Sequence, residues 1–380
     1  MKKECPDKSV ASPSQPKPLY VNPYLFLHSV GEEICVWDYF HHQQFILDAP
    51  HLDRLIAHLT SPPLSSSPLD NIFLEEGILS ETPFPRHQWG WDLLGQIYHF
   101  GTRDLDEPEQ RSTLARATDF LNACSAFEKR QLQTGTPDPF IGLPRIDLPD
   151  WRSDHFDLNL GKALEARMTS RVFNGESISL HDLSACLGMT FAQKENPWPE
   201  ADIHKVTFLG KRRTSPSAGG LHSVIPYIVA FHVEGLAPGL YGYDDVSHQL
   251  VLRASYTAAE LDTHVTRLCG DQFFGENAAC GIFFVSRLDQ VWTKYPHSRA
   301  YRDVFLDGGH LSQTLLLLAT SLEWNTWITA YFRDTELVSF LHLRSDADLP
   351  LLYVALGKGD RQALHPSVLE ALRLRQKEST

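Results

Sequence analysis

The chain has 380 residues, which is too long for one typical domain, so we expect about two domains. Hydrophobic residues make up 42% of it and charged residues 21%, as in ordinary soluble globular proteins. The formal net charge of −13 argues against nonspecific nucleic-acid binding, which needs a positive surface.

The cysteines, histidines and apolar runs bear on metal binding and location. The cysteines are scattered without a CxxC pair, and the histidines show no spacing such as HExxH, so we expect no metal site. Scattered cysteines fit a reducing cytosol. Residues 1–18 are rich in Pro, Ser and Lys, lack the apolar core of a signal peptide and are expected to form a disordered tail. The longest apolar run, at 315–320, is far shorter than the ~20 residues that span a bilayer. We expect a cytoplasmic protein without membrane contact.

The region 19–150 is expected to alternate short strands with short helices. Apolar alternation within 26–45 indicates strands, and the Pro- and Ser-rich run 61–70 indicates a loop. Helices are predicted over 52–59, 71–79, 91–100 and 115–132. This alternation suits a small winged-helix-like module.

The stretch 134–151, TGTPDPFIGLPRIDLPDW, carries four prolines and two glycines. Such clustering is typical of a linker. We therefore place the domain boundary near residue 150, which leaves 151–380 as the second domain.

The second domain is expected to mix strands with buried helices. Strands are predicted over 224–232, 235–243, 249–253, 280–286 and 351–356. Helices are predicted over 160–171, 180–187, 258–269 and 306–322, with Ser179 as the N-cap of the second. This pattern indicates an α+β fold.

Two arginines and a hydroxyl lie within five residues, at Arg167, Thr169 and Arg171. Arginine can grip a phosphate through two parallel hydrogen bonds, and threonine adds a neutral donor. The segment is therefore a candidate phosphate site. An alternative is a solvated helix end whose arginines offset the helix dipole.

A run of small residues offers a second candidate site, and its members are Pro216, Ser217, Ala218, Gly219 and Gly220. Small residues let a backbone lie against a planar ring and present N–H and C=O groups to its polar edge. The glycine spacing matches neither a Walker loop nor a dinucleotide fingerprint. A plain turn before a strand is the alternative.

Lys294 and Tyr295 place an amine beside a phenol within a polar stretch. Apolar surroundings can lower the pKa of a lysine so that it acts as a base, and a tyrosine can donate or share a proton. The alternative is a surface lysine beside a half-buried tyrosine.

Taken in their order along the chain, these segments resemble the SagB-type dehydrogenases, a branch of the FMN-dependent nitroreductase-like superfamily. The resemblance covers about 155–360. The family's Arg-Arg-Ser-x-Arg-x-Phe motif is similar to 167–173, with Met168 departing from it, and this implies phosphate contacts from Arg167, Thr169 and Arg171. The family's Pro-Ser-x-Gly segment resembles 216–220, and its glycine-leucine-tyrosine turn resembles 236–243.

Two further matches concern the flavin and the reaction. A Gly-Gly-Phe-like segment that borders FMN in the family falls at 329–332, which implies flavin contacts from Ala330 and Tyr331. Lys294-Tyr295 is similar to the Lys-Tyr pair that azoline-oxidising members use in catalysis. The resemblance implies a central mixed or antiparallel sheet flanked by helices, FMN as cofactor, and a homodimer whose subunits share each site. The apolar segment 306–322 suits such an interface or, equally, a core helix.

The implied reaction is the oxidation of peptide thiazolines or oxazolines to thiazoles or oxazoles, with a precursor peptide as substrate and a cyclodehydratase as partner. The N-terminal region 19–150 would contact peptide. Two alternatives stay open: an FMN-dependent reductase or dehydrogenase of a dehydroamino acid or small molecule, and a peptide-binding scaffold without flavin.

Overall fold

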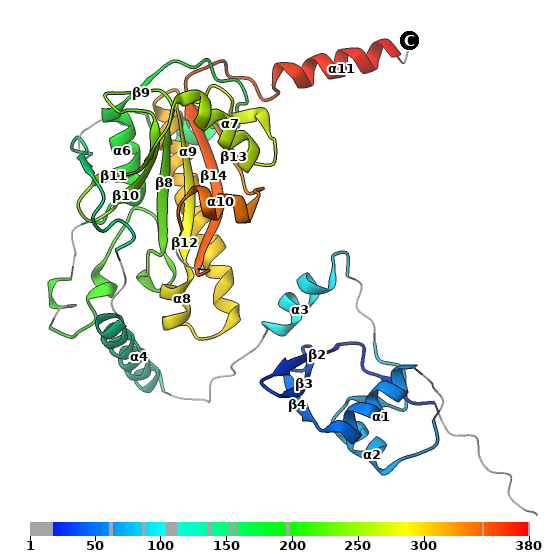
Figure 1. Ribbon diagram of the computed structural model, residues 1–380. Coiled ribbons are helices and arrows are strands. Elements are labelled where there is room, and N and C mark those ends of the chain that lie inside the picture. The colour runs from blue at the N-terminus through cyan, green and yellow to red at the C-terminus, as the bar shows by residue number, and fades with distance from the viewer. Residues whose placement is uncertain are drawn as a thin grey trace, which may run out of the picture. The chain divides into compact units, whose positions relative to one another are not determined.

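The structure is a computed structural model of the chain, and it divides into two compact units, Met1–Gln110 and Arg111–Thr380 (Figure 1). It describes residues 18–60, 64–85, 89–103, 112–134, 138–151, 156, 158–194, 198–201, 203–343 and 346–378. Apart from its last residue, the expected tail lies outside the described residues.

The boundary predicted near residue 150 is wrong, because 138–151 is part of the second unit. Strand β6 (Arg145–Asp147) pairs antiparallel with β11 (Gln249–Ser255) at one edge of the main sheet, and Phe140 is buried among its apolar side chains. Helix α4 (Thr113–Thr134) also belongs to this unit. The prolines and the glycine within 138–151 therefore lie inside the second unit rather than in a gap between domains.

The first unit begins with strands and continues with helices. Strands β2 (Leu25–Val30), β3 (Glu33–Asp38) and β4 (Gln43–Leu47) form an antiparallel sheet. Two-residue strands β1 (Tyr20–Val21) and β5 (Leu79–Ser80) pair with each other. The helices are α1 (Ala49–Thr60), α2 (Pro68–Glu75) and α3 (Leu93–Gly101). The winged-helix comparison stays a prediction.

Helix α2 begins three residues earlier than predicted because its start signals lie inside the supposed loop. Ser67 caps the helix, and Pro68 occupies its first turn. The Asp70 side chain accepts a hydrogen bond from the Ser67 N–H and receives Arg54 and His58 from α1. These interactions lower the pKa of Asp70 and tie α1 to α2.

A seven-stranded sheet forms the centre of the second unit, in the order β13-β14-β12-β8-β10-β11-β6, and every neighbouring pair is antiparallel. The remaining strands of this sheet are β8 (Val224–Ala230), β10 (Gly239–Asp244), β12 (Cys280–Arg287), β13 (Asn325–Thr329) and β14 (Asp348–Gly357). The expected α+β fold with a central antiparallel sheet is thus confirmed. The short strands β7 (Ile178–Ser179) and β9 (Val233–Glu234) pair in parallel beside it.

Helices cover both faces of this sheet (Figure 1). On one face, α6 (Leu180–Phe191) and α9 (Tyr301–Ser321) pack on alternate strand residues such as Ile228 and Phe284. On the other, α7 (Ala258–Leu268) and α10 (Asp334–Phe340) pack on the intervening residues, such as Val229 and Phe283. Because both faces are buried, the central strands read as continuous apolar runs.

Two predicted helices of the second unit differ by five residues at one end. Helix α5 (Leu160–Ala166) stops before Arg167, which is extended, so that Thr169 can bridge to Thr326 at the sheet edge. Helix α9 begins at Tyr301 rather than near residue 306, so Gly308 and Gly309 lie inside it.

Two further helices of this unit are α8 (Leu288–Lys294) and α11 (Pro366–Glu378). Across the described ranges, no helix combines the length and apolar character that a bilayer crossing requires.

Candidate active site

The turn 216–220 is held by a buried carboxylate. Ser217 Oγ donates a hydrogen bond to Asp307 Oδ2 at 2.5 Å, and the Ala218 N–H donates to Asp307 Oδ1 at 3.1 Å. Ser217 Oγ also accepts from the His222 N–H at 2.9 Å. Asp307 projects from α9 and is only 5% exposed, and its burial raises its pKa. Sequence analysis missed Asp307, because its partners lie about 90 residues away in the chain.

The structure brings Lys294 and Tyr295 against this turn. Lys294 ends α8, and its Nζ donates to the Gly219 carbonyl at 2.8 Å. Gly219 has a φ of +58°, which favours glycine, and a Cβ there would lie 2.5 Å from Lys294 Nζ and collide with the Tyr295 hydroxyl. Glycine therefore permits both the turn and the close approach of the amine and the phenol.

Helix α4 covers the lysine from another side. Lys294 Nζ lies 6.0 Å from the centre of the Phe127 ring, and Cys124 is buried on the same helix. Burial lowers the pKa of Lys294, since the charged amine loses water. Sequence analysis did not connect α4 with the lysine.

The pKa of the neighbouring Tyr295 phenol shifts in the opposite direction. Burial raises the pKa of Tyr295, and the nearby carboxylates of Asp303 and Asp307 add to the rise. The two side chains thus shift toward a neutral amine that can take a proton and a phenol that keeps one.

The arginine segment lies elsewhere in the unit, beside the chain that follows the last strand of the sheet. Arg171 Nη1 donates to the Ala363 carbonyl at 2.5 Å, and Arg361 donates to the Ala166 carbonyl. The Asn174 N–H donates to the Lys358 carbonyl at 3.1 Å. Lys358 and Arg361 therefore lie on the segment that packs against residues 166–174. The run GKGDR, which begins at the last residue of β14, is the sequence signal for them.

The residues present fit a phosphorylated, planar cofactor. Guanidinium and ammonium groups with a threonine hydroxyl are the donors that a phosphate prefers. Between the two arginines, Ser170 is 1% exposed, and its hydroxyl has no hydrogen-bond partner in the part of the chain that the structure describes. The glycine turn at 219–220 supplies the backbone that could lie against a ring.

The segment after β13 belongs neither to the arginine segment nor to the turn 216–220. Ala330 and Tyr331 follow the strand at the end opposite the bridge between Thr169 and Thr326. Tyr331 is 64% exposed, and its ring lies over Gly270, where a Cβ would collide with it. A single chain thus places the expected flavin contacts on separate elements.

Comparison with known proteins gives a family match in the second unit. The model of the nitroreductase family matches residues 164–358. These residues include the arginine segment, the turn and the Lys-Tyr pair, and they end at Lys358, before Arg361.

Individual relatives match over different extents. TfxC, a protein of the trifolitoxin operon of Rhizobium leguminosarum bv. trifolii, is 32% identical over 125 residues, which cover 32% of this chain and 33% of TfxC. MJ1384 of Methanocaldococcus jannaschii, named as a nitroreductase, is 24% identical over 213 residues, which cover 56% of this chain and 96% of MJ1384. Among solved structures, the Escherichia coli microcin synthetase McbBCD complex with truncated pro-MccB17 matches at 15% identity and a TM-score of 0.44, covering 67% of this chain and 100% of that one.

Proposed function

The chain belongs to the nitroreductase family, whose members are oxidoreductases that typically bind flavin, and from this premise we propose that it is an FMN-dependent dehydrogenase acting on peptides. Its substrate is a thiazoline or oxazoline formed within a precursor peptide, and its product is the aromatic thiazole or oxazole. The observation that carries the proposal is the contact of Lys294 with Gly219, beside the Tyr295 hydroxyl.

The arginine segment and the chain after β14 would hold the FMN phosphate, through Arg167, Thr169, Arg171, Lys358 and Arg361. The turn 216–220 would border the ring. When bound, FMN supplies the two-electron acceptor that aromatisation requires. The phosphate-binding residues and the turn 216–220 lie on separate elements of one chain. We therefore propose a homodimer in which each site takes residues from both copies.

Lys294 is the better candidate for the base. The C=N bond of an azoline acidifies the proton on the neighbouring ring carbon, and a neutral amine can take that proton. The lowered pKa of Lys294 favours the neutral amine, whereas the raised pKa of Tyr295 keeps the phenol protonated. Tyr295 then donates a hydrogen bond that orients the substrate or the lysine.

The peptide as substrate is supported by the similarity to TfxC, a protein from the operon of a toxin. We further propose that the first unit binds part of the precursor peptide and that a cyclodehydratase supplies the azoline. Both partners follow from the resemblance of Lys294-Tyr295 to the pair of azoline-oxidising enzymes.

A second candidate function is a flavin-dependent reductase of another substrate. The match to MJ1384 over 96% of its length favours it, since that protein is named as a nitroreductase. This enzyme would need NAD(P)H and would be indifferent to azoline peptides.

The first test is the visible spectrum of the purified protein, with the released cofactor identified by mass. We expect a flavin spectrum and FMN. A colourless protein that takes up no added FMN would exclude both enzymes and leave a peptide-binding scaffold. NAD(P)H bleaching of the flavin with turnover of a nitro compound or dehydroamino acid, but not of an azoline, would select the reductase.

A further inference from the structure

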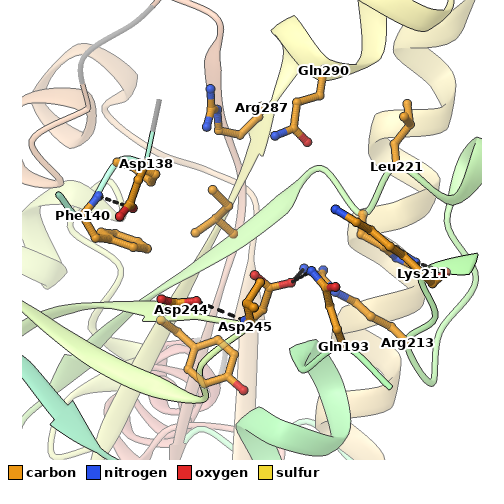
Figure 2. Close-up of a pocket in the computed structure, with 15 residues that line it drawn as sticks. Asp138, Phe140, Gln193, Lys211, Arg213, Leu221, Asp244, Asp245, Arg287 and Gln290 are labelled. Carbon is orange, nitrogen blue, oxygen red and sulfur yellow. Dashed lines mark hydrogen bonds and ion pairs between the residues drawn. The ribbon is translucent and has the colours of Figure 1, made fainter. Parts of the chain in front are cut away.

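Two cavities of the second unit adjoin each other beside the candidate active site. The larger, of about 410 Å³, has Asp138 and Phe140 on one side and Lys211 and Leu221 on the other (Figure 2). The smaller, of about 250 Å³, lies against α4. Both are lined by Lys211, Leu221 and Gln290, so the two hollows form one groove, which we call the α8 groove.

The α8 groove runs past the catalytic lysine. Gln290 precedes Lys294 by one helical turn, so the two side chains lie on the same face of α8. Phe127 lines the groove and also faces Lys294 Nζ. Leu221 follows the turn whose Gly219 carbonyl accepts from the lysine. Three walls of the groove are thus neighbours of the base.

The acidic groups of the groove already have partners. Asp138 and Asp244 receive Arg145 at 3.2 and 2.5 Å, and Asp245 receives Arg213 at 2.8 Å. The remaining acid, Glu128 of α4, accepts from the Thr207 N–H at 2.8 Å. A ligand in the groove would therefore meet little unpaired negative charge.

The unpaired groups of the groove include several hydrogen-bond donors. The side chains of Lys211 and Gln290 have no hydrogen-bond partner or ion pair among the residues that the structure describes. The Arg213 side chain is 3% exposed. Its terminal nitrogens donate to the Val224 carbonyl and to Asp245, whereas its Nε has no acceptor among the described residues. The buried Nε of Arg213 is closed to a ligand, so the free donors that the groove offers to a ligand rich in acceptors are those of Lys211 and Gln290. Leu132, Leu221 and Phe140 add apolar surface.

From these observations we propose that the α8 groove binds the peptide segment next to the oxidised ring, with main-chain carbonyls and an acidic side chain facing Lys211 and Gln290. The inference rests on the proposed function for the identity of the ring, and it adds where the flanking residues bind. An extended peptide suits the groove because each residue presents a carbonyl acceptor and leaves its side chain for the apolar wall.

Binding is the direct test, with a fluorescein-labelled peptide that carries one thiazole, two acidic neighbours and several residues on each side. The FMN-loaded full chain is compared with Lys211→Glu, Gln290→Leu and the matched control Lys129→Glu, an exposed lysine on α4 that lines neither cavity. We expect the Kd to rise about tenfold or more for Lys211→Glu, the worth of one charge-assisted hydrogen bond, and less for Gln290→Leu. The control should leave the Kd unchanged.

A short competitor, the same thiazole capped as its N-acetyl methylamide, distinguishes binding of the flanking residues in the groove from binding of the ring. Its inhibition constant should be the same for wild type and Lys211→Glu, because it lacks the flanking residues. Equal Kd values of the long peptide for wild type and Lys211→Glu would overturn the inference. So would an equal loss for long and short ligands, which would indicate a general defect.

The binding assay also distinguishes this inference from the proposed function. If Lys211→Glu weakens peptide binding while the wild type oxidises no azoline, the groove assignment holds and the assigned reaction fails. If the wild type oxidises the azoline but Lys211→Glu binds and reacts as the wild type does, the reaction holds and the groove assignment fails.

Discussion

At the residue scale, the candidate site depends on how water is removed from one amine. Lys294 packs against the Gly219 carbonyl and the Phe127 ring, and burial lowers its pKa below the ordinary lysine value. The neutral amine is the form that accepts a proton. Activity should therefore rise with pH through the pKa of Lys294, and this rise should begin below the pH at which a solvated lysine titrates.

Phe127→Ala should shift that rise to higher pH. Removing the ring readmits water to the amine, which favours the charged form and moves the pKa back toward the ordinary value. The measurement is the pH profile of kcat/KM for an azoline peptide, with Phe120→Ala as control because Phe120 is half exposed on the same helix. An unchanged profile for Phe127→Ala would show that the profile reports another group.

Gly219 offers a second residue-scale prediction. Gly219→Ala would place a side chain at a φ of +58° and push it into Lys294 and Tyr295, so turnover should fall by at least about 100-fold. The melting temperature should change little, because the new Cβ meets the ends of the Lys294 and Tyr295 side chains and no backbone atom. Gly31→Ala is the control, since it carries the same type of strain in the first unit with open space around it. Wild-type turnover in Gly219→Ala would remove the turn from the site.

At the element scale, the close packing of the sheet sets its stability. A Cβ on Gly281 of β12 would enter the buried ring of Tyr353 on β14. Gly281→Ala should cost about 1–3 kcal/mol in the free energy of unfolding, as overpacked cores do. Gly309→Ala on α9 meets no atom within 4 Å and should be neutral or stabilising by up to about 1 kcal/mol. Denaturant titration of both variants checks the contrast, and equal effects would contradict it.

The segment after β14 is the element on which flavin affinity should depend. Arg361→Ala removes one charged donor from the chain that contacts Ala166, directly before the arginine segment, which should weaken FMN binding about tenfold or more. Arg373→Ala on α11 is a matched control, because its guanidinium is exposed and paired with Glu370. Fluorescence titration of the flavin-free protein measures both. Equal affinities of Arg361→Ala and wild type would place the phosphate elsewhere.

The elements themselves were largely predictable where sequence patterns are local. The run CGIFFVS identified β12 because both faces of that strand are buried, and Ser179 capped α6 as expected. Prediction failed where a tertiary contact determines the secondary structure of a segment. Residues 145–147 join the sheet through β11, and the helix before Arg167 stops because Thr169 bridges to β13.

The same division holds for the candidate site. Lys294, Tyr295 and the glycine turn were recognisable as short motifs, and the structure places them in contact. Asp307 was not recognisable, because a single acid in an apolar helix gives no sign of the backbone that it will hold. Phe127 of α4 was out of reach as well, since it comes from a region assigned to the other domain.

At the scale of the whole molecule, the boundary between the units makes a prediction about truncation. A chain of residues 111–380 retains α4 and β6 and should fold with bound flavin. A chain of residues 151–380 lacks both, which leaves the edge of β11 unpaired and uncovers Lys294. It should bind flavin weakly and unfold at a lower temperature. Equal melting temperatures of the two fragments would contradict the boundary at residue 110.

The measurement that tests the central claim most directly is the mass of a thiazoline-containing peptide after incubation in air with the FMN-loaded protein. We predict that the wild type removes two hydrogens per ring, and that Lys294→Ala removes none while it retains flavin. Tyr295→Phe should fall between them. A wild type that leaves the peptide mass unchanged, or a Lys294→Ala variant as active as the wild type, would contradict the account.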